Sequence, residues 1–299
     1  MKVASGQKCS LYERTWFKIV MFQISWKIKS LLFKLLSFFK LSKTLFFIQK
    51  KITKRSSFDY KEPVFYWEYH YKYLKENNSQ TLIEFGAGKS LAQNIFLSYK
   101  FNQRLEQTLI DVSKMLDLDL FNQANNQISK LLEINKLPNA RSIADLKKYY
   151  NINYSAPMGL DQINKSNLKF DACISSATLE HLSMQDLKEN FKLLKKIINN
   201  SGIISAAIDY SDHFSHTDKN IGNLNFLQFN EKEWTKYNSQ MLFQNRLRHQ
   251  DYRKLFKSQG YKLFEIKGDY GKYPSKISEQ FDITNNETSM LWGYFLLKV

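Results

Sequence analysis

The chain has 299 residues, enough to bury a full hydrophobic core. Its two cysteines, Cys9 and Cys173, exclude a disulfide-stapled secreted domain and suit a reducing cytosol. The net charge of +16 is uneven, because residues 1–57 hold 13 Lys and Arg against one acid, a net of +12, which leaves +4 for the rest. The basicity therefore belongs to a leading segment.

This leading segment, residues 16–55, is dense in Phe, Leu, Ile and Trp and is broken by a lysine every few residues. Its longest uncharged run, 19–26, falls short of the ~20 apolar residues that a membrane-spanning helix requires. We see neither the uninterrupted apolar stretch nor the cleavage site of a secretory signal. The composition instead predicts an amphipathic helical segment over 1–58.

Lysines eleven residues apart return to nearly the same side of a helix. Four of them define one stripe: Lys18, Lys29, Lys40 and Lys51. Lys27 and Lys34 lie on the opposite side and depart from the pattern. An apolar helix with a lysine stripe suits an anionic membrane surface. Packing on the rest of the chain, a partner helix and nucleic acid are the alternatives, and the many bulky apolar side chains favour the membrane over nucleic acid.

The next segments read as a helix over 65–71 followed by a strand over 81–84, which ends in Glu84, Phe85, Gly86, Ala87 and Gly88. Glycines after a strand permit a sharp turn and let a ligand approach the backbone closely. The sequence therefore predicts a cofactor-binding turn at Gly86–Gly88.

Apolar runs and helical patterns then alternate, which predicts a parallel sheet covered on both faces. The second strand ends at Asp111, about 20 residues past the glycine turn, where an acid can accept hydrogen bonds from ribose hydroxyls. A helix follows the fourth strand, with apolar residues from Leu187 to Ile197, and a turn is expected at 199–202. The later strands are expected at 107–110, 151–154, 170–175, 203–208, 261–266 and 290–297.

Three blocks give this pattern a specific likeness: 84–88, 170–175 with 179–182, and 201–204. The chain resembles a class I S-adenosylmethionine-dependent methyltransferase over roughly 60–299. The resemblance implies an α/β fold, a three-layer Rossmann-like sheet of seven strands with the last one antiparallel, here preceded by the helical extension. The methyltransferase domain would occupy 59–299, with an insertion at about 211–245 forming a lid over the acceptor.

The resemblance also implies S-adenosylmethionine as cofactor. The residues expected to contact it are Glu84, Gly86, Ala87, Gly88, Asp111 and Ser176. The chain departs from the family in two places. Ser90 stands where a third glycine is common, and 156–158 (Ala-Pro-Met) offer no acid near the adenine.

Candidate catalytic residues follow the fourth and fifth strands, beside the point where ligands bind in such sheets. His181, Asp209 and His213 are candidates for the base that takes a proton from an attacking hydroxyl. Asp209 opens a polar cluster, 209–218, with three carboxylates and two imidazoles. The spacing in this cluster matches no metal signature, and we assign no metal.

Aromatic and basic residues after this cluster are expected to contact the acceptor, and the set predicted to bind it is Asp212, His216, Trp234, Arg246 and Arg248. We expect O-methylation of a small molecule, a glycan precursor or a lipid-linked acceptor, in the cytoplasm at the inner face of the membrane, which residues 16–55 would contact. The alternatives are a non-catalytic cofactor-binding scaffold and a nucleic-acid methyltransferase.

Overall fold

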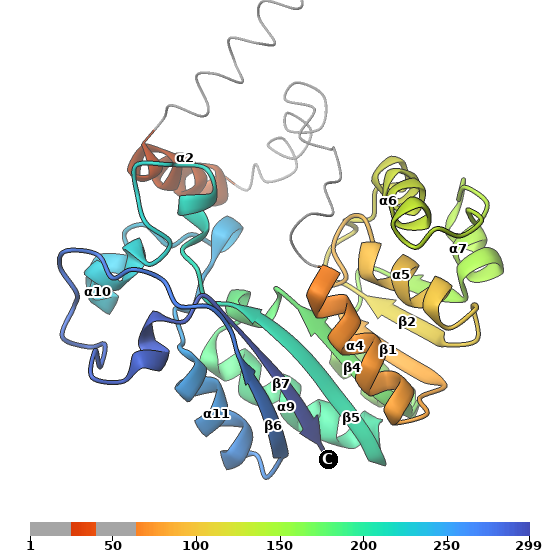
Figure 1. Ribbon diagram of the computed structural model, residues 1–299. Helices are drawn as coiled ribbons and strands as arrows, with labels where there is room; N and C mark the ends of the chain where they lie inside the picture. Colours follow the sequence, from red (N-terminus) through yellow and green to blue (C-terminus); the bar gives the residue numbers. More distant parts are fainter. Residues whose placement is uncertain (1–24, 40–63) are drawn as a thin grey trace, which may run out of the picture. The chain divides into compact units, whose positions relative to one another are not determined.

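The computed structural model describes residues 25–39 and 64–299, which form two compact units (Figure 1). The sheet unit consists of 64–209, Leu247–Gly268 and Trp292–Val299. The loop unit consists of 25–39, Tyr210–Arg246 and Asp269–Leu291. The domain boundary expected near residue 58 lies outside the described residues.

Seven strands form the sheet in the order β3-β2-β1-β4-β5-β7-β6. They are β1 (Thr81–Phe85), β2 (Glu106–Ile110), β3 (Ile152–Ser155), β4 (Phe170–Ser176), β5 (Ile198–Asp209), β6 (Lys262–Lys267) and β7 (Trp292–Lys298). Neighbouring pairs from β3 through β5 are parallel, and β7 is antiparallel to both β5 and β6. This is the topology of class I methyltransferases, and it confirms the expected fold.

The strand β5 starts earlier than the sequence indicates. A turn is expected at 199–202, yet these residues belong to β5, which pairs with β4 from Ile198 onward with a shift in register between Phe170 and Ala172. Gly202 lies in this irregular stretch. A Cβ there would come within 2.7 Å of the Asp171 carbonyl oxygen, so the close approach of the two strands requires glycine.

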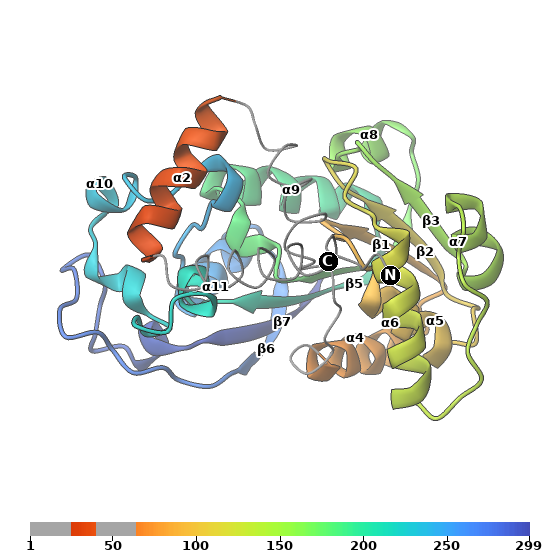
Figure 2. The same cartoon turned by 90° about the horizontal axis from the view of Figure 1, so that it is seen from above.

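Helices cover both faces of the sheet (Figure 2). One face carries α4 (Val64–Glu76) and α5 (Ala92–Lys100), with α6 (Leu118–Leu131) and α7 (Ile143–Tyr150) packed against α5. The other face carries α8 (Leu160–Lys165), α9 (Met184–Ile197) and α11 (His249–Ser258). Capping boxes start two of these helices, with Ser142 and Asp145 at α7 and Ser183 and Asp186 at α9.

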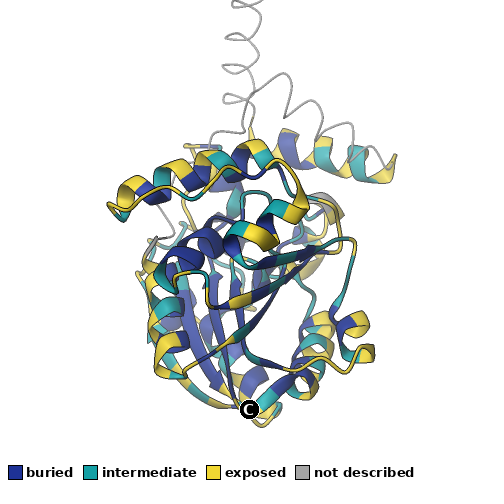
Figure 3. Cartoon of the chain, turned by 90° about the vertical axis from the view of Figure 1, so that its right-hand side faces the viewer, coloured by how far each residue is buried: buried dark blue, intermediate teal, exposed yellow. Residues whose placement is uncertain are grey.

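The main core lies between the sheet and the first of these helix layers, and the inner sides of the strands are buried (Figure 3). It joins Trp67 and Leu74 of α4, Phe96 of α5 and Phe121 of α6 to the strand residues. Cys173 is fully buried in β4 and free, and it packs there as a small apolar residue.

Short helices and loops make up the rest of the loop unit: η2 (His213–His216), η3 (Asn225–Gln228), α10 (Glu231–Trp234), η4 (Gln240–Leu242) and η5 (Asn286–Ser289). Helix α2 (Trp26–Phe38) packs on them. Their common core contains Trp26, Phe214, Leu224, Phe226, Leu227 and Trp234. The Trp26 ring lies 4.7 Å from the Tyr237 ring and 5.5 Å from the Phe214 ring, centroid to centroid.

Polar contacts also hold α2 in the loop unit. The Trp26 amide donates to Asp218 Oδ2 at 2.8 Å, and the Ser30 hydroxyl donates to the Tyr237 carbonyl at 2.8 Å. The ammonium of Lys29 donates to the Thr217 carbonyl at 3.3 Å, and that of Lys34 donates to the Thr235 carbonyl at 2.7 Å. These contacts turn the polar side of the helix inward.

The lysine stripe therefore does not face outward in the helix that the structure describes. Lys29, the member of the stripe that lies in α2, is buried, because its stem packs against the loop unit while its charge meets a carbonyl. Lys18, Lys40 and Lys51 lie outside the described residues. Within the described residues, no helix combines the length and the apolar character that crossing a bilayer requires.

Candidate functional site

The candidate site lies where the parallel strands of the sheet unit end. Strands β1, β2, β4 and β5 run in the same direction, so the residues that follow Phe85, Ile110, Ser176 and Asp209 gather at one edge. This is the edge at which open α/β sheets bind ligands. It brings together the predicted residues of the sheet unit that follow or end these strands.

The glycine turn after β1 has the backbone that was expected of it. Gly86 and Gly88 both have φ of +74°, which residues with a Cβ rarely adopt. A Cβ on Gly86 would lie 2.5 Å from Thr178 Cγ2, so this glycine lets the turn pass close to the loop after β4. A Cβ on Gly88 would meet no atom of the described part of the chain within 4 Å. Gly88 therefore borders open space, and a ligand can reach its backbone.

Asp111 follows β2 and turns toward the glycine turn. The Gly88 amide donates to Asp111 Oδ2 at 3.4 Å, and the Ser113 amide donates to Oδ1 at 3.0 Å. A carboxylate has about four lone-pair positions, so two acceptor positions remain after these bonds. That capacity matches the two hydroxyls of a ribose.

Glu84 lies beneath the turn and is 2% exposed. Its carboxylate accepts hydrogen bonds from the side-chain amides of Gln93 and of Asn94, the second at 2.6 Å. Burial raises the pKa of the Glu84 carboxyl to about 7, with Asp111 adding to the rise, although the two amide donors oppose it. A positive group at this point would draw the carboxyl back to its ionised form.

A cavity of about 510 Å³ adjoins Asp111, between the loops after β2 and β3. Its lining includes Leu116, Tyr154, Ala156 and Met158, and the Met158 amide donates to the Asp111 carbonyl at 2.8 Å. Val112, directly after the acid, is 79% exposed. These apolar residues are candidates for contact with a flat ring. The sequence did not identify them, although an apolar residue directly after a strand-end acid could have indicated such a contact.

The carboxyl ends of β4 and β5 hold the two catalytic candidates of the sheet unit. His181 ends η1 (Leu179–His181) and is exposed, while Asp209 ends β5. Glu180 beside His181 is buried. Burial raises the pKa of the Glu180 carboxyl well above its usual range, and the negative charge of Asp209 adds to that shift. Glu180 therefore keeps its proton at a pH where an exposed glutamate is ionised.

The polar candidates within 212–216 belong to the loop unit. The rings of His213 and His216 stack with centroids 5.3 Å apart, and His216 Nε2 lies 3.1 Å from the Ser211 hydroxyl. Asp212 is fully buried; it accepts from the Phe214 amide at 2.9 Å and from the Asn225 side chain at 3.0 Å. Burial raises the pKa of Asp212 to about 6. These bonds give Asp212 a role in holding the start of η2.

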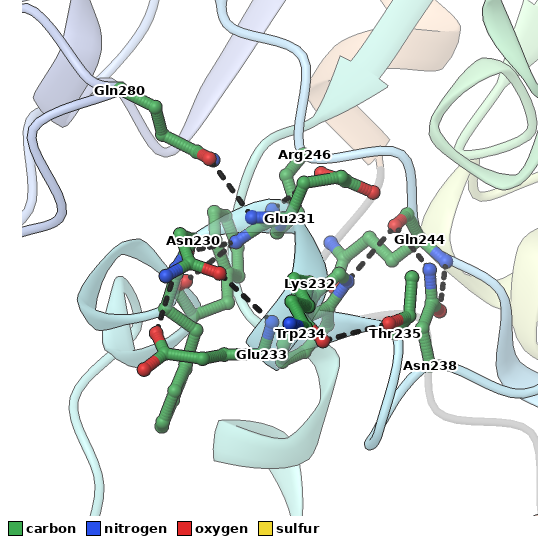
Figure 4. Close-up of polar contacts among 12 residues, drawn as sticks. Asn230, Glu231, Lys232, Glu233, Trp234, Thr235, Asn238, Gln244, Arg246 and Gln280 are labelled. Carbon is green, nitrogen blue, oxygen red and sulfur yellow. Dashed lines mark hydrogen bonds and ion pairs between the residues drawn. The ribbon is translucent and has the colours of Figure 1, made fainter.

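Trp234 and Arg246 lie together inside the loop unit (Figure 4). The guanidinium of Arg246 donates to the Phe226 carbonyl at 3.1 Å and to Glu231 Oε2 at 2.6 Å, and it lies 5.3 Å from the centre of the Trp234 ring. The Trp234 indole donates to the Gln244 carbonyl at 3.3 Å. Arg248 is also buried, just before α11 in the sheet unit. Substrate contact by Asp212, His216 and these three residues stays a prediction.

No protein-family model matches the chain, and no curated protein does. Similar solved structures include an S-adenosylmethionine-dependent methyltransferase from Archaeoglobus fulgidus (11% identity, 78% of this chain and 94% of that one covered, TM-score 0.40). Another S-adenosylmethionine-dependent methyltransferase, from Clostridium acetobutylicum, has 13% identity, with 87% of this chain and 98% of that one covered and a TM-score of 0.40.

A third similar structure is a magnesium protoporphyrin IX methyltransferase from Synechocystis PCC 6803 with bound S-adenosylhomocysteine (10% identity, 78% of this chain and 81% of that one covered, TM-score 0.43). At these TM-scores the fold assignment rests on the chain's own strand order and not on the matches.

Proposed function

We propose that the protein is an S-adenosylmethionine-dependent methyltransferase. The observation that carries the proposal is the glycine turn with its open space at Gly88, directly opposite Asp111 at the ligand-binding edge of this fold. A ligand bound at this turn requires such an opening, whereas turnover is what separates an enzyme from a scaffold that only binds the cofactor.

The residues at this edge fit the parts of the cofactor. The two remaining acceptor positions of Asp111 suit the ribose hydroxyls, and the cavity beside Met158 suits the adenine. Glu84, whose pKa of about 7 reflects an unfavourable buried charge, suits a nearby ammonium group such as that of the methionine end. We therefore propose that Glu84, Asp111 and the turn at Gly86–Gly88 bind S-adenosylmethionine.

The bound cofactor would supply an electrophilic methyl group on a sulfonium. The protein's part is to hold the attacking oxygen in line with that methyl group and to accept its proton. His181 in η1 after β4 and Asp209 at the end of β5 are the proposed candidates for this base, with His213 of the loop unit as the third. The attacking oxygen would gain the methyl group and give its proton to the base, with S-adenosylhomocysteine as the spent cofactor.

Calorimetry with S-adenosylhomocysteine tests the cofactor, and transfer of a labelled methyl group to lipid, small-molecule and RNA fractions of cell extract tests the reaction. We expect binding and a labelled lipid or small-molecule product. Binding without turnover on any fraction would favour the scaffold, and a labelled RNA would favour the nucleic-acid methyltransferase. Absence of binding by correctly folded protein removes the proposal.

We further propose that the acceptor is met at an anionic membrane surface, which α2 contacts. Helix α2 and the adjoining Phe39 carry six apolar residues that are 41–80% exposed: Ile28, Leu31, Leu32, Leu35, Phe38 and Phe39. Exposed apolar patches of this kind mark interaction sites. The flanking Lys27 is exposed, and residues 1–57 carry a net charge of +12, which favours an anionic lipid surface over a neutral partner.

Binding to vesicles that contain phosphatidylserine tests this surface. The double variant Leu31→Asp with Leu35→Asp should lower vesicle affinity by about tenfold or more, because it removes two apolar contacts and adds two negative charges. The matched control, Ile143→Asp with Leu168→Asp, changes two residues of similar exposure (54% and 50%) in the sheet unit and should leave binding unchanged. Equal losses in both variants, or tight binding to RNA without binding to vesicles, would exclude α2 as a membrane contact.

A further inference from the structure

A chain of four polar side chains runs through the sheet unit and ends at the candidate site. Its members are Tyr294 on β7, Ser205 on β5, His70 on α4 and Ser176 at the end of β4. The Tyr294 and Ser205 hydroxyls are hydrogen bonded to each other. His70 Nδ1 lies 2.5 Å from the Ser205 hydroxyl, and His70 Nε2 lies 2.8 Å from the Ser176 hydroxyl. Tyr294, Ser205 and His70 are completely buried, and only Ser176 is partly exposed.

The inner end of the chain decides the direction of its hydrogen bonds. Burial raises the pKa of the Tyr294 phenol, so this hydroxyl keeps its proton. Its only hydrogen-bond neighbour among the described residues is Ser205, and the rings of Tyr69 and Tyr73 pack around it. If Ser205 donated to Tyr294, the phenolic hydrogen would be buried without an acceptor, which costs about 1–3 kcal/mol. Tyr294 is therefore the donor to Ser205.

The remaining bonds follow from this first one. Because Ser205 accepts from Tyr294, its own hydrogen is free to point to His70 Nδ1. Burial lowers the pKa of His70 to about 3, so the ring is neutral and carries a single hydrogen. With Nδ1 as acceptor, that hydrogen is on Nε2 and is donated to the Ser176 oxygen. Ser176 must then direct its own hydrogen outward, toward the candidate site.

We infer that Ser176 is a committed hydrogen-bond donor, oriented by His70, and that it binds a carboxylate oxygen of the cofactor's methionine end. This rests on the proposed function. The loop that carries Ser176 lies against the glycine turn, since the Thr178 hydroxyl contacts the Gly86 carbonyl at 3.4 Å. A carboxylate is the acceptor that the methionine end offers, and its ammonium cannot take a hydrogen from Ser176. His70 is then a positioning residue.

The tautomer of His70 can be read without any ligand. In the nitrogen-15 NMR spectrum of the full-length protein with labelled histidine, we expect a neutral His70 ring protonated on Nε2, assigned by its absence in His70→Gln. A ring protonated on Nδ1 would overturn the inferred direction, whatever the protein binds.

Ligand binding tests the carboxylate. Ser176→Ala should lower the affinity for S-adenosylhomocysteine about tenfold and leave the affinity for its decarboxylated analogue unchanged within about twofold. His70→Leu should reproduce this selective loss, and His70→Gln, whose amide can still donate to Ser176, should restore part of it. Equal losses for both ligands overturn the carboxylate assignment. If the parent protein binds neither ligand, the proposed function itself is wrong. The tautomer of His70 found by NMR is independent of that outcome.

Discussion

The buried Glu84 makes the stability of the protein depend on pH in a predictable way. Its pKa is raised from 4.5 to about 7 in the folded chain, mainly by burial. A carboxyl group whose pKa is raised on folding stabilises the folded state fully when the pH lies below its pKa in the unfolded chain. This contribution is lost as the pH rises through about 7. At about 1.36 kcal/mol for each pH unit between the two values, the full change is about 3 kcal/mol, of which about 2 kcal/mol falls between pH 5.5 and 8.5.

Glu84→Gln should remove this dependence. Among the residues that the structure describes, the oxygens of the Gln93 and Asn94 amides have no hydrogen-bond partner, so one of these amides can turn and accept from the new side chain. We expect urea unfolding to show the variant gaining about 2 kcal/mol relative to the parent between pH 5.5 and 8.5. Glu106→Gln is the control, because its hydrogen bond to Lys147 lowers the pKa of Glu106 and any change falls at more acid pH. A parent–variant difference that stays flat across this range would refute the reasoning.

Three further predictions concern single sites. Gly88→Ala should cost about 1 kcal/mol of stability, because Gly88 has a positive φ. Calorimetry should show a loss of binding free energy for S-adenosylhomocysteine that exceeds this cost, because the new methyl group enters the open space at the turn. Unchanged affinity would remove Gly88 from the site. Trp234→Ala should destabilise the loop unit by about 3–5 kcal/mol in urea unfolding, and a loss below 1 kcal/mol would contradict its place in the core. Ser142→Ala should cost about 1 kcal/mol in the same assay by removing the cap of α7, whereas the exposed Ser166→Ala should cost less.

Much of the sheet could be predicted from the sequence, because strand ends carry local signals. Glu84 with its two glycines, and Asp111 after an apolar run, identify the ends of β1 and β2 without tertiary information. The turn expected at 199–202 was wrong, since Asn and Ser in a strand bulge read as a turn when the neighbouring strand is unknown. Gly202 is there because β4 comes close, which composition alone does not reveal.

The side-chain environment could not be predicted in the same way. The inward orientation of Lys29 depends on a carbonyl group 188 residues away in the sequence. The periodicity of one helix carries no information about so distant a partner. For His70 the sequence predicts only that it lies in a helix over 65–71, whereas its two serine partners come from β4 and β5. Trp234 and Arg246 were expected to contact the acceptor because one is aromatic and the other basic. The structure adds that both side chains are buried within the loop unit.

The Trp26 indole bears on how the protein can be shortened. A fragment that starts at residue 58 would lose this ring from between Phe214 and Tyr237, and Asp218 would lose the amide that it binds. Such a truncation would combine the loss of basic charge with damage to the fold, so point substitutions on the outer side of α2 are the cleaner way to separate lipid attraction from structural integrity.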